Sequence, residues 1–269
     1  MDLQLKGKTA FVSGSSSGIG LGIALELAAE GCDVVVHGRD KARTQETARQ
    51  VEAKGVRAAV TLGDLAIEKE ASTVCDAALD AFGHIDILVN NCGRTLRYDN
   101  PDWSVLESKD WVASFEVNVL AGIRLARRFV PGMKERNWGR IVNVSSTTAT
   151  HVWGILIDYG AAKAALNKIT ADMSKTLGPH GITVNAIIPG TILTPAIADY
   201  MEVLKKQHSW GEDPEENERR YTKEIFPQSV PRLGKLRDTA TLTTFLASPL
   251  AGYINGAYVR IDGGLAQFM

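Results

Sequence analysis

Short runs of β-branched and other apolar residues recur along the whole chain, and none of them alternates strictly with polar residues. A strand buried on both faces of a parallel sheet has this continuous apolar pattern, because helices cover both of its sides. The pattern therefore predicts seven buried strands. They are expected at Thr9–Ser13, Val34–His37, Val56–Thr61, Asp86–Val89, Arg140–Val144, Thr183–Ile188 and Tyr258–Ile261.

Longer stretches with helical periodicity separate these runs, for example from Ile19 to Glu30 and from Lys41 to Lys54. Strands that alternate with helices predict βαβ units with right-handed crossovers. We therefore predict that residues 1–269 form one α/β domain. Its fold is expected to be a Rossmann-type, doubly wound, seven-stranded parallel sheet with helices on both faces.

Residues 191–232 depart from this alternation, because they lack strand signals and include a charged stretch, Glu212–Glu224. A long excursion from a compact domain is typically a functional lid or a disordered insert. A solvated helical face accounts for the charges equally well. Both a substrate lid and a plain surface segment remain open at this stage.

Composition narrows the class of protein. A formal net charge of -1 argues against a generally basic nucleic-acid binder, and no apolar run has the length of a membrane-spanning helix. The first eight residues lack the apolar core of a signal peptide. Cys32, Cys75 and Cys92 lack the spacing of a metal cluster or a disulfide framework. We therefore expect a cytoplasmic protein with reduced thiols and no metal, nucleic-acid or membrane partner.

A glycine-rich turn at Gly14, Gly18 and Gly20 joins the first predicted strand to the first predicted helix. Glycines let the backbone approach a pyrophosphate closely, and a helix amino terminus offers free N–H groups to an anion. The spacing differs from the common G-x-G-x-x-G pattern, so a purely structural turn is an alternative. Its place in the βαβ unit favours a dinucleotide site.

The end of the second predicted strand carries Gly38 and Arg39. NAD-selective proteins commonly place a carboxylate here for the ribose 2′-hydroxyl, whereas an arginine suits the 2′-phosphate of NADP. Asp40 lies one position too far along for the carboxylate role. We therefore predict that NADP is preferred and that NAD is possible. A solvated arginine at a helix start is the alternative interpretation.

Tyr159 and Lys163 lie four residues apart in a predicted helix, so both side chains share one face. A nearby cation lowers the pKa of a phenol by favouring the phenolate. By itself, a tyrosine and a lysine at this spacing are usually exposed surface residues without a catalytic role. Here Ser145 and Ser146 follow a predicted strand at the edge where doubly wound sheets bind ligands, and Asn118 lies in a helical stretch before that strand.

Together these motifs resemble the short-chain dehydrogenase/reductase family over essentially the whole chain, most closely its 3-oxoacyl-carrier-protein reductases. Ser146 precedes Tyr159 by thirteen residues, the usual interval of the family, which selects it over Ser145. Departures are few: Cys92 replaces a common alanine, and Ser17 replaces a basic residue of many NADP-preferring members. The matching features are Ser13–Gly20, Asp64, Asn90–Gly93, Asn118, Ser146, Tyr159, Lys163, Pro189–Gly190 and Asp262–Gly264.

The resemblance implies the catalytic roles. Tyr159 is expected to exchange a proton with the reacting oxygen, and Ser146 to donate a hydrogen bond to that oxygen. Lys163 is expected to lower the pKa of Tyr159 and to hold the nicotinamide ribose, and Asn118 to hold a water of a proton relay. The implied cofactor contacts are Gly14, Ser16, Ser17, Gly18, Ile19, Gly20, Arg39, Asp64, Leu65, Asn91, Gly93, Tyr159, Lys163, Pro189, Gly190, Ile192 and Thr194.

The substrate pocket is expected to form from segments after the fourth and fifth strands and from the lid. Trp153 and Trp210 suit an apolar or aromatic carbonyl compound, although both are also typical core residues. The predicted substrate contacts are Ser146, Thr148, Trp153, Tyr159 and Ile192.

The predicted function is NADP-dependent interconversion of a small-molecule ketone or aldehyde and an alcohol. Two alternatives remain open: a 3-oxoacyl-carrier-protein reductase, whose acidic partner requires a basic docking face such as Arg127, Arg128 and Lys134, and a nonenzymatic NADP-binding scaffold or sensor. The resemblance also implies a homotetramer built through the helices that carry Asn118 and Tyr159, with a homodimer as the alternative.

Overall fold

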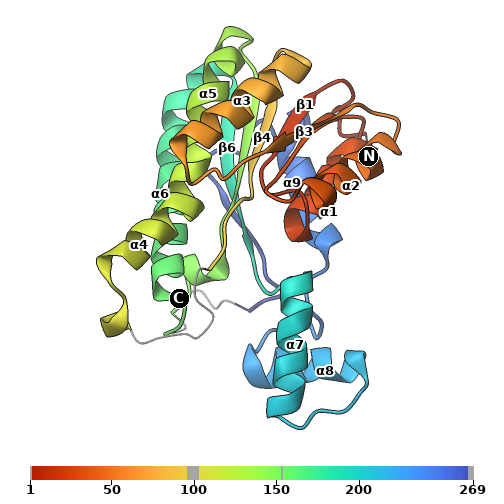
Figure 1. Ribbon diagram of the computed structural model, residues 1–269, viewed down its shortest axis with the longest axis vertical. Helices are drawn as coiled ribbons and strands as arrows, with labels where there is room; N and C mark the ends of the chain where they lie inside the picture. The colour runs from red at the N-terminus through yellow and green to blue at the C-terminus, as the bar shows by residue number, and fades with distance from the viewer. Residues whose placement is uncertain (1, 96–102, 153, 266–269) are drawn as a thin grey trace.

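A seven-stranded parallel sheet forms the centre of the protein in the computed structural model, which describes residues 2–95, 103–152 and 154–265. The strand order is β3-β2-β1-β4-β5-β6-β7 (Figure 1). This confirms the predicted fold class, and every predicted strand is present to within two residues at each end. The strands are β1 (Thr9–Val12), β2 (Asp33–Gly38), β3 (Ala58–Leu62), β4 (Ile87–Asn90), β5 (Gly139–Val144), β6 (Ile182–Pro189) and β7 (Tyr258–Ile261).

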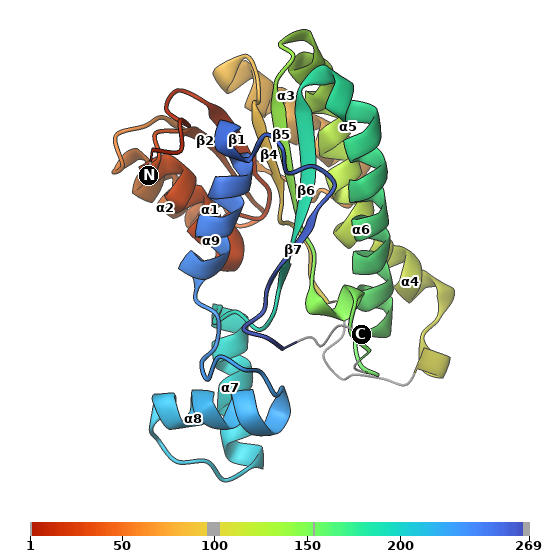
Figure 2. The ribbon, with the colours of Figure 1, turned by 180° about the vertical axis from the view of Figure 1, so that it is seen from behind.

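Helices cover both faces of the sheet (Figures 1 and 2). One layer contains α1 (Gly18–Ala29), α2 (Lys41–Glu52) and α9 (Leu236–Ala247), and the other contains α3 (Glu68–Phe82), α5 (Ala121–Glu135) and α6 (Ile157–Leu177). The described chain also has shorter elements: α4 (Ser108–Phe115), π-helical turns at Glu116–Leu120 and Tyr221–Ile225, and 3₁₀ turns at Trp103–Val105, Thr147–Ala149, Gly178–His180 and Pro249–Ala251.

The two layers explain why the strands do not alternate between apolar and polar residues. In β1, Ala10 and Val12 pack into the core shared with α1, α2 and α9, whereas Phe11 packs into the core shared with α3 and α5. All three side chains are fully buried. Both faces of the strand therefore require apolar side chains.

The sheet order places the turns after β1 and β4 next to each other. β1 pairs with β2 on one side and with β4 on the other. The connections that leave the carboxyl ends of β1 and β4 run to opposite faces, and such a switch point is where open α/β sheets bind ligands.

Residues 195–233 form a separate cluster beyond the carboxyl ends of the strands, with α7 (Pro195–Gln207) and α8 (Pro214–Arg220) standing apart from the sheet layers (Figures 1 and 2). We call this segment the lid. Its own apolar core contains Leu204, Trp210, Tyr221 and Leu233. Trp210 is only 6% exposed, so this candidate for a substrate contact packs inside the lid.

The lid joins the sheet at a narrow base. The Thr191 Oγ1 and Tyr221 Oη atoms lie 3.1 Å apart and share a hydrogen bond. Ile192 forms a short parallel bridge with Gly234 at the point where the chain returns from the lid to the sheet.

No helix in the described part of the chain combines the length and apolar character needed to cross a bilayer.

Candidate active site

The glycine-rich turn after β1 wraps closely against the turn after β4. Gly14 and Gly18 have positive φ angles of 64° and 57°, a backbone region that favours glycine. A Cβ atom at Gly20 would stand 2.5 Å from Asn91 Nδ2 and would also contact the carbonyl oxygen of Gly14. Asn91 Nδ2 donates to the carbonyl oxygens of Ser13 (2.9 Å) and Gly14 (3.2 Å). These bonds fix the two turns side by side.

The amino terminus of α1 suits a phosphate group. The Ser17 side chain at its N-cap position forms no capping hydrogen bond, and the first turn of the helix holds no acidic residue. The first backbone N–H groups of a helix lack intrahelical partners and carry partial positive charge. The turn and helix therefore fit the pyrophosphate of a dinucleotide.

A cavity of about 290 Å³ runs along these turns. It brings together eight of the predicted cofactor residues from the turns after β1, β2, β3 and β4. They are Gly14, Ser16, Ser17, Arg39, Asp64, Leu65, Asn91 and Gly93. Sequence reasoning did not assign His37, Arg43 or Gly63 to the site, although they also line the cavity.

Arg39 and Asp64 form an ion pair at one end of this cavity. Arg39 Nη1 lies 3.2 Å from Asp64 Oδ2, and the Arg39 side chain is 54% exposed. Partial burial alone would raise the pKa of Asp64, but the N–H of Ala66 and the Arg39 guanidinium outweigh it and lower that pKa. Asp64 therefore stays ionised, and the pair holds Arg39 at the cavity edge.

Gly38 leaves no room for the carboxylate that NAD-selective proteins use at the end of this strand. A Cβ atom at position 38 would stand 2.8 Å from both Cβ and Oγ of Ser16 and would overlap Thr44 Oγ1. Thr44 Oγ1 is itself held by a 2.6 Å bond to the carbonyl oxygen of Asp40. Any side chain at position 38 therefore requires Ser16 and Thr44 to move.

Lys163 and Tyr159 lie together on α6, as their spacing predicts. Lys163 Nζ is 5.5 Å from the centroid of the Tyr159 ring and donates to the carbonyl oxygen of Val144 at 2.8 Å. Lys163 is 3% exposed, and this burial lowers its pKa to about 8. The ammonium form still predominates at neutral pH, so a cation stands beside the phenol.

Asn118 lies in the π-helical turn Glu116–Leu120, which sequence periodicity did not predict. Such single π turns often occur at functional sites. Asn118 Nδ2 donates to the carbonyl oxygens of Ser114 (2.9 Å) and Arg94 (3.0 Å), and its Oδ1 accepts the N–H of Arg94 at 3.0 Å. The amide thus fixes the turn after β4 close to Lys163.

Ser146 is the amino-terminal cap of the 3₁₀ turn after β5. Its Oγ accepts hydrogen bonds from the N–H of Thr148 at 3.2 Å and from Thr148 Oγ1 at 3.0 Å. Both bonds use lone pairs of Oγ, so neither of them uses the hydroxyl hydrogen of Ser146. Ser145 is buried instead and donates to the carbonyl oxygen of Lys163 at 3.4 Å.

The turn that carries Ser146 packs directly on the start of α6. A Cβ atom at Gly160 would stand 2.9 Å from the carbonyl oxygen of Thr148. The absence of a side chain at Gly160, the residue after Tyr159, therefore lets this turn approach the backbone of α6. Thr148, predicted as a substrate contact, here hydrogen-bonds to Ser146.

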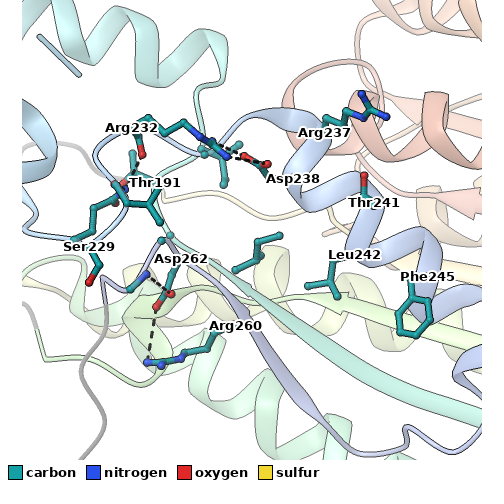
Figure 3. Close-up of a pocket in the computed structure, with 18 residues that line it drawn as sticks. Thr191, Ser229, Arg232, Arg237, Asp238, Thr241, Leu242, Phe245, Arg260 and Asp262 are labelled. Carbon is teal, nitrogen blue, oxygen red and sulfur yellow. Dashed lines mark hydrogen bonds and ion pairs between the residues drawn. The ribbon is translucent and has the colours of Figure 1, made fainter. Parts of the chain in front are cut away.

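Four further predicted residues lie at the end of β6 or shortly after it. Thr194 caps α7, and its Cγ2 atom would lie 3.3 Å from a Cβ atom at Gly18, so the residue just before the lid lies beside the phosphate turn. Gly190 and Ile192 line a second cavity of about 990 Å³ between β7, α9 and the lid (Figure 3). Ile192 is 4% exposed. Pro189 ends β6. Trp153 lies outside the described residues.

The fold and these contacts define a dinucleotide-binding oxidoreductase site, and comparison with known proteins agrees. The short chain dehydrogenase family model matches residues 8–203. The uncharacterized oxidoreductase YvaG of Bacillus subtilis is 34% identical over 270 residues, covering 99% of each chain. The D-beta-hydroxybutyrate dehydrogenase of Cupriavidus necator is 33% identical, covering 97% of this chain and 98% of its own.

Among solved structures, the L-sorbose reductase of Gluconobacter frateurii, complexed with NADPH and L-sorbose, superposes with a TM-score of 0.92. It is 33% identical, and the match covers 100% of both chains. The protein therefore belongs to the short-chain dehydrogenase/reductase family. It is an NAD(P)-dependent oxidoreductase that interconverts alcohols and carbonyl compounds, which favours the enzymatic prediction over a nonenzymatic scaffold.

Proposed function

We propose that the protein reduces a small-molecule ketone with NADPH and that Tyr159 is its general acid and base. The observation that carries this proposal is the contact between Lys163 and Tyr159 beside a cofactor cavity that Arg39 borders. The cofactor supplies the hydride when it is bound.

The side chains divide the remaining work. Tyr159 gives a proton to the carbonyl oxygen during reduction and takes it back during oxidation. The Lys163 ammonium favours the phenolate form of Tyr159 and holds the nicotinamide ribose, and Ser146 donates its hydroxyl hydrogen to the reacting oxygen. Asn118, which is hydrogen-bonded on both sides of its amide, orders the water that links Lys163 to solvent.

Two features support NADP over NAD. Arg39 is a long, cationic side chain at the edge of the cavity, which suits a 2′-phosphate. Its ion pair with Asp64 is exposed enough to rearrange when that phosphate binds. Gly38 carries no carboxylate at the end of β2, and a side chain there would have to displace Ser16 or Thr44. The NADPH bound to the L-sorbose reductase is consistent with this preference.

A hydroxylated or carboxylated small ketone is the proposed substrate class, because the named relatives act on L-sorbose and on D-beta-hydroxybutyrate. The 3-oxoacyl-carrier-protein alternative requires a basic face on α5. Of the three cations named for that face, Arg128 is paired with Asp76 at 2.6 Å, which reduces its positive charge.

The test is a substrate panel assayed with NADPH and NADH on the purified protein. It contains L-sorbose and other ketoses, acetoacetate, an oxosteroid and a 3-oxoacyl thioester. We expect the fastest turnover with a free small ketone and NADPH. Faster turnover of the thioester would favour the carrier-protein alternative, and no turnover of any member would contradict the proposal.

We also propose a cytoplasmic homotetramer. The helical segment from α4 to α5 exposes Val112, Phe115 and Leu120, and apolar side chains grouped on one segment favour association. Light scattering of the purified protein tests this, and a monomer would contradict it.

A further inference from the structure

His37 is a buried histidine beside the cofactor cavity that has no part in the mechanism above. It is the residue before Gly38 at the end of β2, and its side chain is 2% exposed. The ring stacks on Phe11, with centroids 6.0 Å apart and an interplanar angle of 29°. Buried polar groups require hydrogen-bond partners, so the partners of this ring show what it does.

Both ring nitrogens bind turns that line the cavity. Nδ1 accepts the backbone N–H of Gly14 at 3.0 Å, and Nε2 lies 3.1 Å from the carbonyl oxygen of Gly63. Because a backbone N–H can only donate and a carbonyl oxygen can only accept, this pair of contacts requires the neutral ring with its hydrogen on Nε2. A neutral imidazole meets both requirements at opposite edges of one rigid ring.

The backbone of His37 adds two further contacts to the same turn. Its N–H donates to Ser15 Oγ at 3.0 Å, and its carbonyl oxygen accepts the N–H of Ser15 at 2.9 Å. The turn after β1 is therefore held at both Gly14 and Ser15. What the ring adds to these backbone contacts is a link from this turn, at Gly14, to Gly63.

That link joins the two ends of the adenosine half of the site. Gly14 begins the turn that fits the pyrophosphate, and Gly63 immediately precedes Asp64, which holds Arg39. Both turns line the 290 Å³ cavity. The imidazole thus connects the phosphate turn to the turn that carries Asp64 and its partner Arg39.

We propose that His37 is a positioning residue that sets the separation of the phosphate turn and the Asp64 turn, and so controls affinity for the 2′-phosphoadenosine half of the cofactor. This inference deepens the proposed function and rests on its assignment of the cavity to NADP. His37 touches neither Tyr159 nor Lys163 in the described contacts, so its effect is confined to binding.

The test uses three replacements of His37 and two halves of the cofactor. His37→Phe keeps a flat ring and loses both hydrogen bonds, His37→Asn can keep the acceptor near Gly14, and His37→Gln can keep the donor near Gly63. Thr61→Val is the matched control, because Thr61 is equally buried and lies opposite His37 in the β2–β3 register, but its hydroxyl donates to the carbonyl oxygen of Val36 and to neither turn. The probes in calorimetry are 2′,5′-ADP and nicotinamide mononucleotide.

We expect His37→Phe to weaken 2′,5′-ADP binding by about tenfold or more, the value of one to two hydrogen bonds, and His37→Asn and His37→Gln to fall between it and the wild type. Binding of nicotinamide mononucleotide and kcat at saturating NADPH should stay within about twofold. Wild-type affinity of the Phe variant for 2′,5′-ADP would overturn the inference, as would equal losses for both probes or the same loss in Thr61→Val.

Two arrangements keep this test decisive. If His37→Phe fails to fold, the Asn and Gln variants are compared with Thr61→Val on the same probes, and wild-type binding by both would overturn the inference. The binding measurements need no substrate, so an inactive wild type would contradict the proposed function while the His37 inference is still judged by 2′,5′-ADP.

Discussion

Gly93 leaves space for the Lys163 ammonium: a Cβ atom at position 93 would stand 2.9 Å from Lys163 Nζ and 2.7 Å from Asn118 Oδ1. The turn after β4 therefore reaches Lys163 only because position 93 carries no side chain. The resemblance assigned Gly93 to cofactor binding, and the structure adds this contact with Lys163 and Asn118.

We expect Gly93→Ala to lower kcat by about tenfold to a hundredfold, because a displacement of a catalytic group by about an ångström costs up to this much. Steady-state kinetics with the best ketone of the panel measures the change. Gly211→Ala is the control, since a Cβ atom there meets open space. Unchanged kcat in Gly93→Ala would show that Lys163 tolerates the shift.

Tyr159→Phe removes the proposed proton donor and keeps the ring beside Lys163. We expect kcat to fall by at least about a hundredfold, within the range typical of a general acid. Affinity for NADPH, measured by fluorescence titration, should stay largely intact. Substantial turnover by this variant would contradict the role of Tyr159.

Arg39→Asp replaces the cation at the cavity edge with a carboxylate and also places like charges beside Asp64. We expect the ratio of kcat/KM for NADPH to that for NADH to shrink or reverse, because the 2′-phosphate loses its partner and is repelled. Arg49→Asp on α2, where Arg49 is an exposed partner of Glu46, controls for net charge. Equal affinity of the wild type for both cofactors would contradict the preference.

The buried neutral state of His37 predicts a specific acid sensitivity of stability. Burial lowers the pKa of His37 from 6.5 to about 4, where Asp64 and Arg39 are the nearby charges and act in opposite directions. The unfolded chain takes up the proton near pH 6.5, whereas the folded chain takes it up only near pH 4. The contribution of His37 to the free energy of unfolding is therefore complete above pH 6.5 and is lost as the pH falls towards 4.

His37→Asn lacks this proton linkage. We therefore expect the difference in unfolding free energy between wild type and variant to narrow by roughly 2 kcal/mol from pH 7 to pH 4.5. Urea unfolding at several pH values measures it. A difference that stays constant with pH would show that the folded protein protonates His37 as readily as the unfolded chain does.

Much of the fold followed from local sequence. Continuous apolar runs predicted strands covered on both faces, and the Phe11 and Val12 side chains do enter opposite cores. Strand ends depend on contacts that are distant in the sequence. The third strand begins at Ala58 rather than Val56, because the backbone N–H and guanidinium of Arg57 bind the Asp33 carboxylate before the chain enters the sheet.

Trp210 shows where residue type misleads. An aromatic residue in a predicted lid is typical of a substrate pocket, but this side chain fills the core of the lid with Leu204 and Tyr221. A cluster of helices that stands apart from the sheet needs an apolar centre of its own. Sequence carries no direct signal for this choice between pocket and core.

The sequence by itself determined what depends on short separations along the chain: the strand pattern, the glycine turn and the shared helix face of Tyr159 and Lys163. Tertiary structure decided which distant residues meet, because hydrogen-bond partners and steric space depend on how the turns converge at the edge of the sheet. Only there does His37 join Gly14 to Gly63 and does Gly93 make room for Lys163.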